Sequence, residues 1–169
     1  IPLQMQNPIG RAIAALYPAP NRNAPFANFV SSPTLEDDVN QFDVRMDGRT
    51  DRLAVTSLFS FSDRHLFEPF AGPSFALVPG FGNEVPRRAQ NLAVSAIYQL
   101  GNGVCTEARM GWTRVSSSVR QEGQGTSLIQ QVGLPEVSTE PRDWGLSHIS
   151  VTGFSPLGHE FNNPQESTT

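Results

Sequence analysis

The sequence has one cysteine, no long apolar run and no strong excess of charge. Because Cys105 has no second cysteine to pair with, an intrachain disulfide is excluded, and so is a metal cluster held by several thiolates. No run approaches the about 20 apolar residues that a membrane-spanning helix needs, which excludes a helical membrane protein. The net charge of -4 is mild, so nothing predicts a nucleic acid as a partner. These absences leave open an all-β protein, including a barrel whose short strands are only half apolar.

Residues that favour turns are abundant instead. Gly and Pro number 14 each, or 28 of 169 residues, roughly 17% against about 12% in average usage. This composition describes a chain rich in turns and loops. The chain starts at Ile1 without a methionine or a signal peptide and ends in the polar segment 162–169, so we expect it to be a piece of a longer protein.

Residues 1–39 are expected to form a loop region with one short helix at about 8–17. Asn7 can cap this helix, and Pro8 suits its first position. Apolar residues then recur at helical spacing: Ile9, Ala12, Ile13 and Leu16. Pro18 ends the pattern.

Residues 40–116 carry the strongest pattern, which predicts four strands in two pairs. The strands are expected at 40–47, 52–62, 89–100 and 104–116. A short turn around Gly48 joins the first pair, and Gly-Asn-Gly at 101–103 is a strong hairpin signal in the second pair.

Apolar and charged side chains take opposite faces of these strands. The charged face carries Asp43, Arg45, Glu107 and Arg109. We expect Met46 to pair with Leu53, and Val104 to pair with Leu100, because these registers bring the apolar residues of each hairpin together on one face.

Two architectures explain a sheet with one apolar and one charged face. A soluble β-sandwich buries the apolar face in its core, whereas a membrane barrel turns that face to lipid and keeps the charges in a wet lumen. Alternation alone does not separate them, but the connections favour the barrel. The turns within each pair are short, while the connection 63–88 and the region 117–169, with an extended segment at about 147–154, are long. Compact soluble domains rarely carry such loops, whereas outer-membrane barrels alternate short periplasmic turns with long extracellular loops.

The barrel interpretation assigns each face an environment. The residues expected to face lipid or to form the aromatic girdles are Phe42, Val44, Met46, Phe59, Tyr98, Met110 and Trp112. The charged candidates for the lumen are Asp43, Arg45, Glu107 and Arg109. A register slip of one residue would move arginines into lipid, at about 2–4 kcal/mol each near the midplane, so the lumen explains the charges directly.

Short motifs along the chain resemble one family. The segments are IGRAIAALYPAPN at 9–21, NQFDVRMDGRTDRLAVTSLFSFSD at 40–63, RRAQNLAVSAIYQLGNGVCTEARMGWTRVSSS at 87–118 and HISVTGFSPLG at 148–158. Their order and spacing resemble the TonB-dependent receptors of the Oar-like type, which are outer-membrane proteins with a carboxypeptidase-regulatory-like N-terminal domain. The matching positions are Leu16, Tyr17, Pro18, Pro20, Asn21, Gln41, Asp43, Arg45, Asp47, Phe59, Ser60, Phe61, Ser62, Asp63, Glu107, Arg109, Gly111, Trp112 and Arg114. Thr106 stands where the family usually has Asn, and Trp112 where Tyr is common.

The resemblance implies an all-β fragment of a transmembrane antiparallel barrel in the outer membrane of a Gram-negative-type bacterium. The parent protein would take up a large, unknown extracellular substrate, energised through a plug domain and the TonB complex. The implied surroundings are outer-membrane lipid and that plug, and we expect no cofactor and no catalysed reaction. The alternative is a soluble β-sandwich module that binds a carbohydrate or protein ligand.

Other candidate sites are weaker. His65, His148 and His159 lie in separate loops without ligand spacing, so we expect no metal site. Cys105 has no nearby histidine to activate it, and the acidic run 36–38 lacks the fuller oxygen set that calcium needs. Aromatic loop residues can either pack the loop or form an outer ligand surface, and these are Phe67, Phe70, Phe75 and Phe81.

Overall fold

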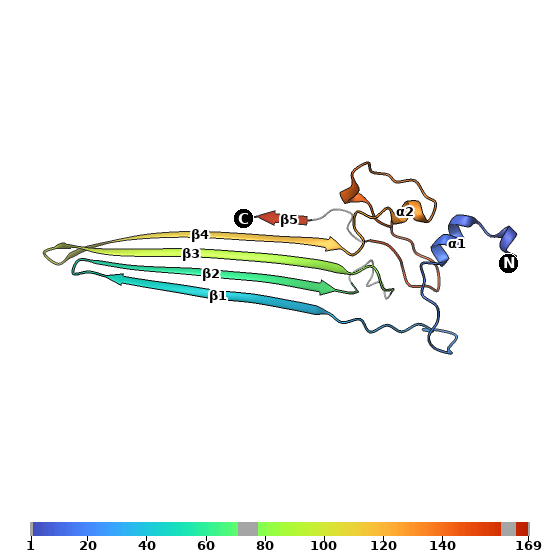
Figure 1. Ribbon diagram of the computed structural model, residues 1–169, viewed down its shortest axis with the longest axis horizontal. Helices are drawn as coiled ribbons and strands as arrows, with labels where there is room; N and C mark the ends of the chain where they lie inside the picture. Colours follow the sequence, from blue (N-terminus) through green and yellow to red (C-terminus); the bar gives the residue numbers. More distant parts are fainter. Residues whose placement is uncertain (1, 71–77, 160–164, 169) are drawn as a thin grey trace. The chain divides into compact units, whose positions relative to one another are not determined.

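The computed structural model describes residues 2–70, 78–159 and 165–168. Phe75 lies outside the described residues. The elements in chain order are η1 (Leu3–Met5), α1 (Pro8–Ala14), β1 (Glu36–Arg49), β2 (Leu53–Glu68), β3 (Asn83–Gly101), β4 (Val104–Gln121), α2 (Leu128–Gln131), η2 (Pro141–Asp143) and β5 (Gln165–Thr168). Figure 1 shows that each of β1 to β4 runs opposite to its neighbour.

The strands form one sheet in the order β1-β2-β3-β4-β5, which is a meander along the chain. Tight turns join the strands within each hairpin. In the first, the Thr50 amide donates to the Leu53 carbonyl at 2.7 Å. In the second, Asn102 and Gly103 have φ values of 53° and 75°, the left-handed pair that a primed hairpin turn requires. The predicted all-β meander is therefore present, with β5 as an addition that the sequence pattern did not indicate.

All four predicted strands exist, and each of them extends well past its predicted bounds at one end or both. β1 begins at Glu36, β2 continues to Glu68 and β4 continues to Gln121. β3 begins at Asn83, so the connection before it covers 69–82 and is shorter than the predicted 63–88. Ladder hydrogen bonds join backbone groups, so a strand can continue where side-chain alternation has already become irregular.

The register of the first hairpin differs from the prediction. Asp47 bonds to Thr56, and Phe42 stacks on Phe61 at 5.2 Å between ring centroids, contacts that fit the pairing of Thr50 with Leu53. The predicted pairing of Met46 with Leu53 is wrong, because it would place Phe42 and Phe61 four residues out of step. Four is an even number, so the shift leaves every side chain on its predicted face.

The second hairpin keeps the predicted register. The Asn91 side chain donates to the Thr113 hydroxyl at 2.8 Å, which fits the pairing of Leu100 with Val104. Gly101 has a φ of 100° beside the turn. Only glycine adopts that conformation cheaply, so the sequence Gly-Asn-Gly supplies the turn and the residue before it.

The helix α1 starts as predicted and ends earlier. The Asn7 carboxamide oxygen accepts from the amides of Ile9 and Gly10 at 2.9 and 3.3 Å, so Asn7 is the N-cap. Beyond Ala14 the amides of Leu16 and Tyr17 bond three residues back, to Ile13 and Ala14. The chain therefore tightens into 3₁₀-type turns before it reaches Pro18, and the α-helix does not extend to residue 17.

The chain divides into two compact units. The loop unit consists of the described residues of 1–36, 66–84 and 119–164, and the sheet unit of those of 37–65, 85–118 and 165–169. The loop unit has a small core of buried apolar residues, namely Val78, Phe81, Val132, Leu146 and Leu157. The segments that sequence analysis treats as loops thus pack on one another through residues far apart in the chain.

The segment predicted as extended at about 147–154 forms only one isolated bridge, between Ile149 and Leu157. Gly158 makes the return possible, since its φ is 111° and a Cβ there would lie 2.5 Å from the Ser147 carbonyl oxygen. A larger residue at 158 would collide with backbone, so glycine is required at this close approach.

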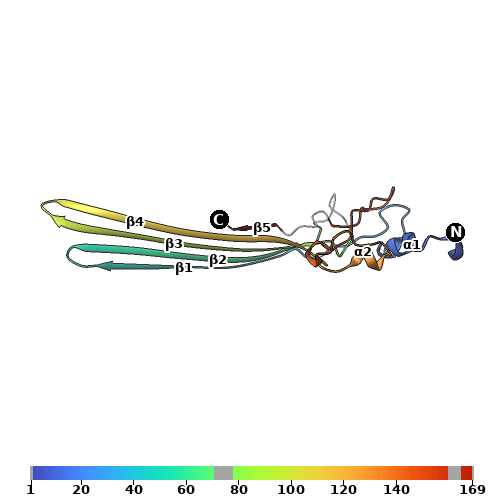
Figure 2. The same cartoon turned by 90° about the horizontal axis from the view of Figure 1, so that it is seen from above.

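The apolar face of the sheet unit is uncovered. Figure 2 shows β1 to β4 as one layer, and within the described residues no second sheet lies against them. Met46 is 66% exposed, Met110 is 63% exposed and Phe42 is 51% exposed. A β-sandwich would bury these side chains between two layers, so the sandwich alternative is wrong for this arrangement.

Candidate functional site

The polar face of the sheet carries a row of bonded side chains at one level across the strands. The Thr56 hydroxyl donates to the Asp47 carboxylate at 2.7 Å, which links β1 to β2. The Ser95 hydroxyl donates to the Glu107 carboxylate at 3.0 Å, which links β3 to β4. Both carboxylates therefore have partners across the sheet, as alternate residues on one face allow.

Each of these carboxylates also pairs with an arginine of its own strand. Arg45 donates to Asp47 through Nε at 2.8 Å and Nη2 at 3.1 Å, and Arg109 donates to Glu107 in the same two-point manner at 2.7 and 3.1 Å. The predicted pairing of Glu107 with Arg109 is present. Arg45 pairs with Asp47, whereas Asp43 does not take part in this pair. Exposed ion pairs of this kind contribute little stability. Their main effect is to fix the positions of the charges on this face.

Two hollows lie among the polar-face residues. One, with a cavity volume of about 350 Å³, is lined by Thr56, Leu58, Ala93, Val94, Ser95, Arg109, Met110 and Gly111. It exists because Ala93 and Gly111 have small or no side chains where the neighbouring levels carry longer ones. The second, of about 230 Å³, is lined by Gln41, Asp43, Ser60, Phe61, Ser62, Ala89, Gln90, Asn91 and Thr113. Its carboxylate, amides and hydroxyls suit hydrogen bonding to water or to a polar chain.

A further ion pair lies on the same face. Arg64 donates to both oxygens of the Asp37 carboxylate at 2.7 Å each. Asp37 belongs to the acidic run 36–38 considered for calcium, and it is neutralised by an arginine. Among the described residues, no group of three metal-ligating side chains could hold an ion.

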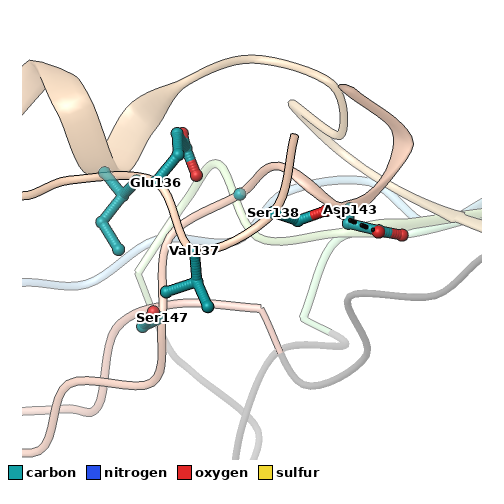
Figure 3. A pocket seen from close by; sticks show the side chains of 7 residues that line it. Glu136, Val137, Ser138, Asp143 and Ser147 are labelled. Carbon is teal, nitrogen blue, oxygen red and sulfur yellow. Dashed lines mark hydrogen bonds between the residues drawn. The ribbon is translucent and has the colours of Figure 1, made fainter. Parts of the chain in front are cut away.

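The loop unit contains a separate pocket of about 340 Å³, and Figure 3 shows its side chains. Its lining residues are Ile129, Glu136, Val137, Ser138, Asp143, Gly145 and Ser147. The Ser138 hydroxyl donates to Asp143 at 2.9 Å, and the Ser127 hydroxyl donates to Glu136 at 2.7 Å. The carboxylates of Glu136 and Asp143 and the hydroxyl of Ser147 line this pocket. Their oxygens can accept hydrogen bonds from hydroxyl or ammonium groups.

His159 is a buried side chain of the loop unit, and both of its ring nitrogens have hydrogen-bond partners. It is 5% exposed, and its Nδ1 accepts from the Leu146 amide at 2.9 Å. Because Nδ1 is the acceptor, Nε2 carries the hydrogen and donates to the Glu122 carbonyl at 2.9 Å. This histidine fastens three segments of backbone together, whereas His148 is exposed. The sequence placed it only as an isolated loop histidine, and no local pattern signals its partners.

Of the aromatic loop residues, Phe81 takes the packing role that the sequence left open as one option. Phe81 is buried at 6% exposure in the core of the loop unit and lies edge-on to His159, with 5.4 Å between ring centroids. Phe67 and Phe70 are half-buried. Phe67 lies against Gly82, and none of the three described rings is fully exposed.

These observations define a class of protein. A single antiparallel layer with one charged face and one uncovered apolar face is the wall of a membrane barrel, because lipid covers the apolar face without a second layer. No helix among the described residues is long and apolar enough to span a membrane.

The comparison with protein families agrees with a membrane barrel. Residues 1–169 match the outer membrane beta barrel domain, so the chain belongs to this family. It lies in the outer membrane of a Gram-negative bacterium, surrounded by membrane lipid, and the family is typically non-enzymatic. The five strands of the described residues form a fragment of such a barrel, since closure takes at least about eight. No curated protein and no solved structure matches the chain.

Proposed function

We propose that these strands belong to a TonB-dependent receptor of the Oar-like type, whose barrel takes up a large substrate across the outer membrane with energy supplied through TonB. The motifs at 9–21, 40–63 and 87–118 support this, because their order matches that family. The uncovered apolar face of β1 to β4 supports the membrane barrel, and the order of these motifs carries the assignment to this type of receptor.

The length of this apolar face suits a bilayer. On β3 it runs from Gln90 at its outer limit to Leu100, ten residue steps or about 33 Å of extended chain. With a tilt of about 40°, this corresponds to about 25 Å along the membrane normal, the height of the apolar band on outer-membrane barrels. The residues assigned to lipid or to the aromatic girdles are Phe42, Val44, Met46, Phe59, Tyr98, Met110 and Trp112.

The charged face is assigned to the lumen. Its proposed lumenal charges are Asp43, Arg45, Glu107 and Arg109. The pairs Arg45–Asp47 and Glu107–Arg109 stand beside the hollow at Ala93 and Gly111. In an intact receptor we expect them to meet the plug or the path of the substrate, because a charged wall with a recess between the charges can accept a polar side chain.

Direction follows from the turns. The hairpin turns at 50–53 and 101–104 are tight and are assigned to the periplasmic side, and the loop unit to the extracellular side. The pocket of about 340 Å³ beside Glu136 and Asp143 would then be open to extracellular molecules.

Energised uptake is tested in cells that carry the intact receptor. Substrate accumulation is measured with and without a protonophore, and in a strain that lacks TonB, while surface binding at low temperature is measured in parallel. We expect accumulation to stop in both cases and binding to persist. Accumulation that continues without TonB would exclude this class of transporter and leave a passive barrel.

A further inference from the structure

We propose that Arg114 on β4, with Arg88 beside it on β3, binds the phosphate of an outer-leaflet lipid. The inference rests on the proposed lipid-facing assignment of the apolar side of the sheet. It adds a specific lipid contact to a side that is otherwise assigned only to general contact with lipid chains.

The apolar face ends in a defined row. Phe42 stacks on Phe61 across β1 and β2, and the pairing set by Asn91 and Thr113 places Gln90 opposite Arg114 on β3 and β4. These four residues, Phe42, Phe61, Gln90 and Arg114, are called the border row. One level towards the turns the face is apolar on every strand, with Val44, Phe59, Leu92 and Trp112.

One level outward from the border row the same face becomes charged. Arg88 donates to Asp63 through Nε at 3.0 Å and Nη2 at 3.2 Å, and its guanidinium lies 5.7 Å from the centre of the Phe61 ring. An arginine over an aromatic ring, beside a carboxylate, is stable where lipid chains give way to headgroups. The change from rings to ions therefore marks the outer limit of the hydrocarbon layer.

Arg114 is the cation that this border leaves unbalanced. Asp63 neutralises Arg88, whereas Arg114 is exposed and forms no ion pair within the part of the chain that the structure describes. Its directly opposed neighbour, Gln90, is neutral, and Arg88 stands diagonally from it. At this border, one positive charge therefore remains without an ion-pair partner among the described residues, on the same face as Trp112 and two residues along β4 from it.

Lipid phosphate fits this position. A guanidinium offers parallel N–H donors that match two oxygens of a phosphate, and the acyl chains of the same lipid can lie along the apolar face below. Trp112 would lie near the headgroup with its apolar ring and polar N–H, and Phe61 would offer an apolar ring face. A soluble anion would gain the charge contact but not the apolar one, so we assign the site to a lipid.

The test uses the intact barrel in detergent. Calorimetric titration with short-chain phosphatidic acid is compared with titration by diacylglycerol of the same chains and by inorganic phosphate. Wild-type protein should bind phosphatidic acid more tightly than either of the others. Arg114→Gln should weaken that binding by about five-fold, the effect of one cation near a membrane surface, and Arg88→Gln should also weaken it.

Arg87→Gln is the matched control, because Arg87 is the sequence neighbour of Arg88 and lies on the opposite face of β3. It should leave phosphatidic acid binding unchanged. Equal binding by wild type and Arg114→Gln, or equal loss in Arg87→Gln, would overturn the proposal. So would inorganic phosphate that competes as well as the lipid does. Retained β-sheet circular dichroism shows that each variant has folded.

A separate measurement tests which side of the sheet faces lipid. In a Cys105→Ser background, a fluorophore attached at Met110→Cys should be quenched by brominated lipid, and one at Ala93→Cys should not. If this facing holds while Arg114→Gln binds phosphatidic acid normally, only the lipid site is rejected. If the two labels behave in the opposite way, the proposed facing of the barrel is itself wrong.

Discussion

At the scale of single residues, the two faces of the sheet predict different effects for the same substitution. Met110 lies on the apolar face and is 63% exposed, whereas Ala93 lies on the polar face beside the hollow. We expect Met110→Arg to destabilise the intact barrel in lipid vesicles by about 2–4 kcal/mol, because the charge enters hydrocarbon. Ala93→Arg should cost less than about 1 kcal/mol, since it enters water. Urea unfolding of both variants measures the difference, and equal costs would contradict the assignment of faces.

Tyr17 shows a residue effect in the loop unit. Its hydroxyl donates to the Ser155 carbonyl at 2.8 Å, and burial raises the pKa of Tyr17 above its ordinary value of 10.0. Burial favours the neutral form of Tyr17. The stability that the neutral side chain contributes is therefore complete below pH 10 and is lost as the pH rises through the folded-state pKa. The ultraviolet difference titration between wild type and Tyr17→Phe should show this tyrosine ionising later than a free one. Ionisation at or below the ordinary value would contradict its burial.

At the scale of elements, His159 joins two positions, Glu122 and Leu146, that lie outside the helices and strands. His159→Ala would leave the Leu146 amide and the Glu122 carbonyl without partners, at about 1–3 kcal/mol for each. Hydrogen exchange of the Leu146 amide should accelerate by about ten-fold or more. His148→Ala removes an exposed ring and is the matched control. Unchanged exchange in His159→Ala would show that other contacts hold these segments.

At the scale of the whole molecule, the sheet leaves its apolar side uncovered within the described residues. Phe42, Met46 and Met110 are exposed on that side, and the five strands of the described residues are fewer than the about eight that closure of a barrel takes. Expressed alone, the chain should aggregate in buffer and remain dispersed only in detergent, because open sheet edges and an apolar face both promote association. Analytical ultracentrifugation and thermal melting measure this. A soluble monomer that melts cooperatively would contradict the barrel fragment.

The sequence alone predicts α1 and β1 to β4 and which of their side chains share a face, but it does not indicate β5, α2, η1 or η2. The period of two in Phe42, Val44 and Met46 assigns faces without any knowledge of partners, and Asn7 and Gly103 mark the start of a helix and a hairpin turn. These features are local, because each depends on a few consecutive residues.

Only the tertiary structure decided the features that join distant residues. The register of the first hairpin depends on Phe42 meeting Phe61, and the loop unit depends on His159 meeting Leu146 and Glu122. Alternation is equally compatible with a buried or a lipid-covered face. The structure decides between them because a buried face needs a second layer, and within the described residues the apolar side of this sheet has none.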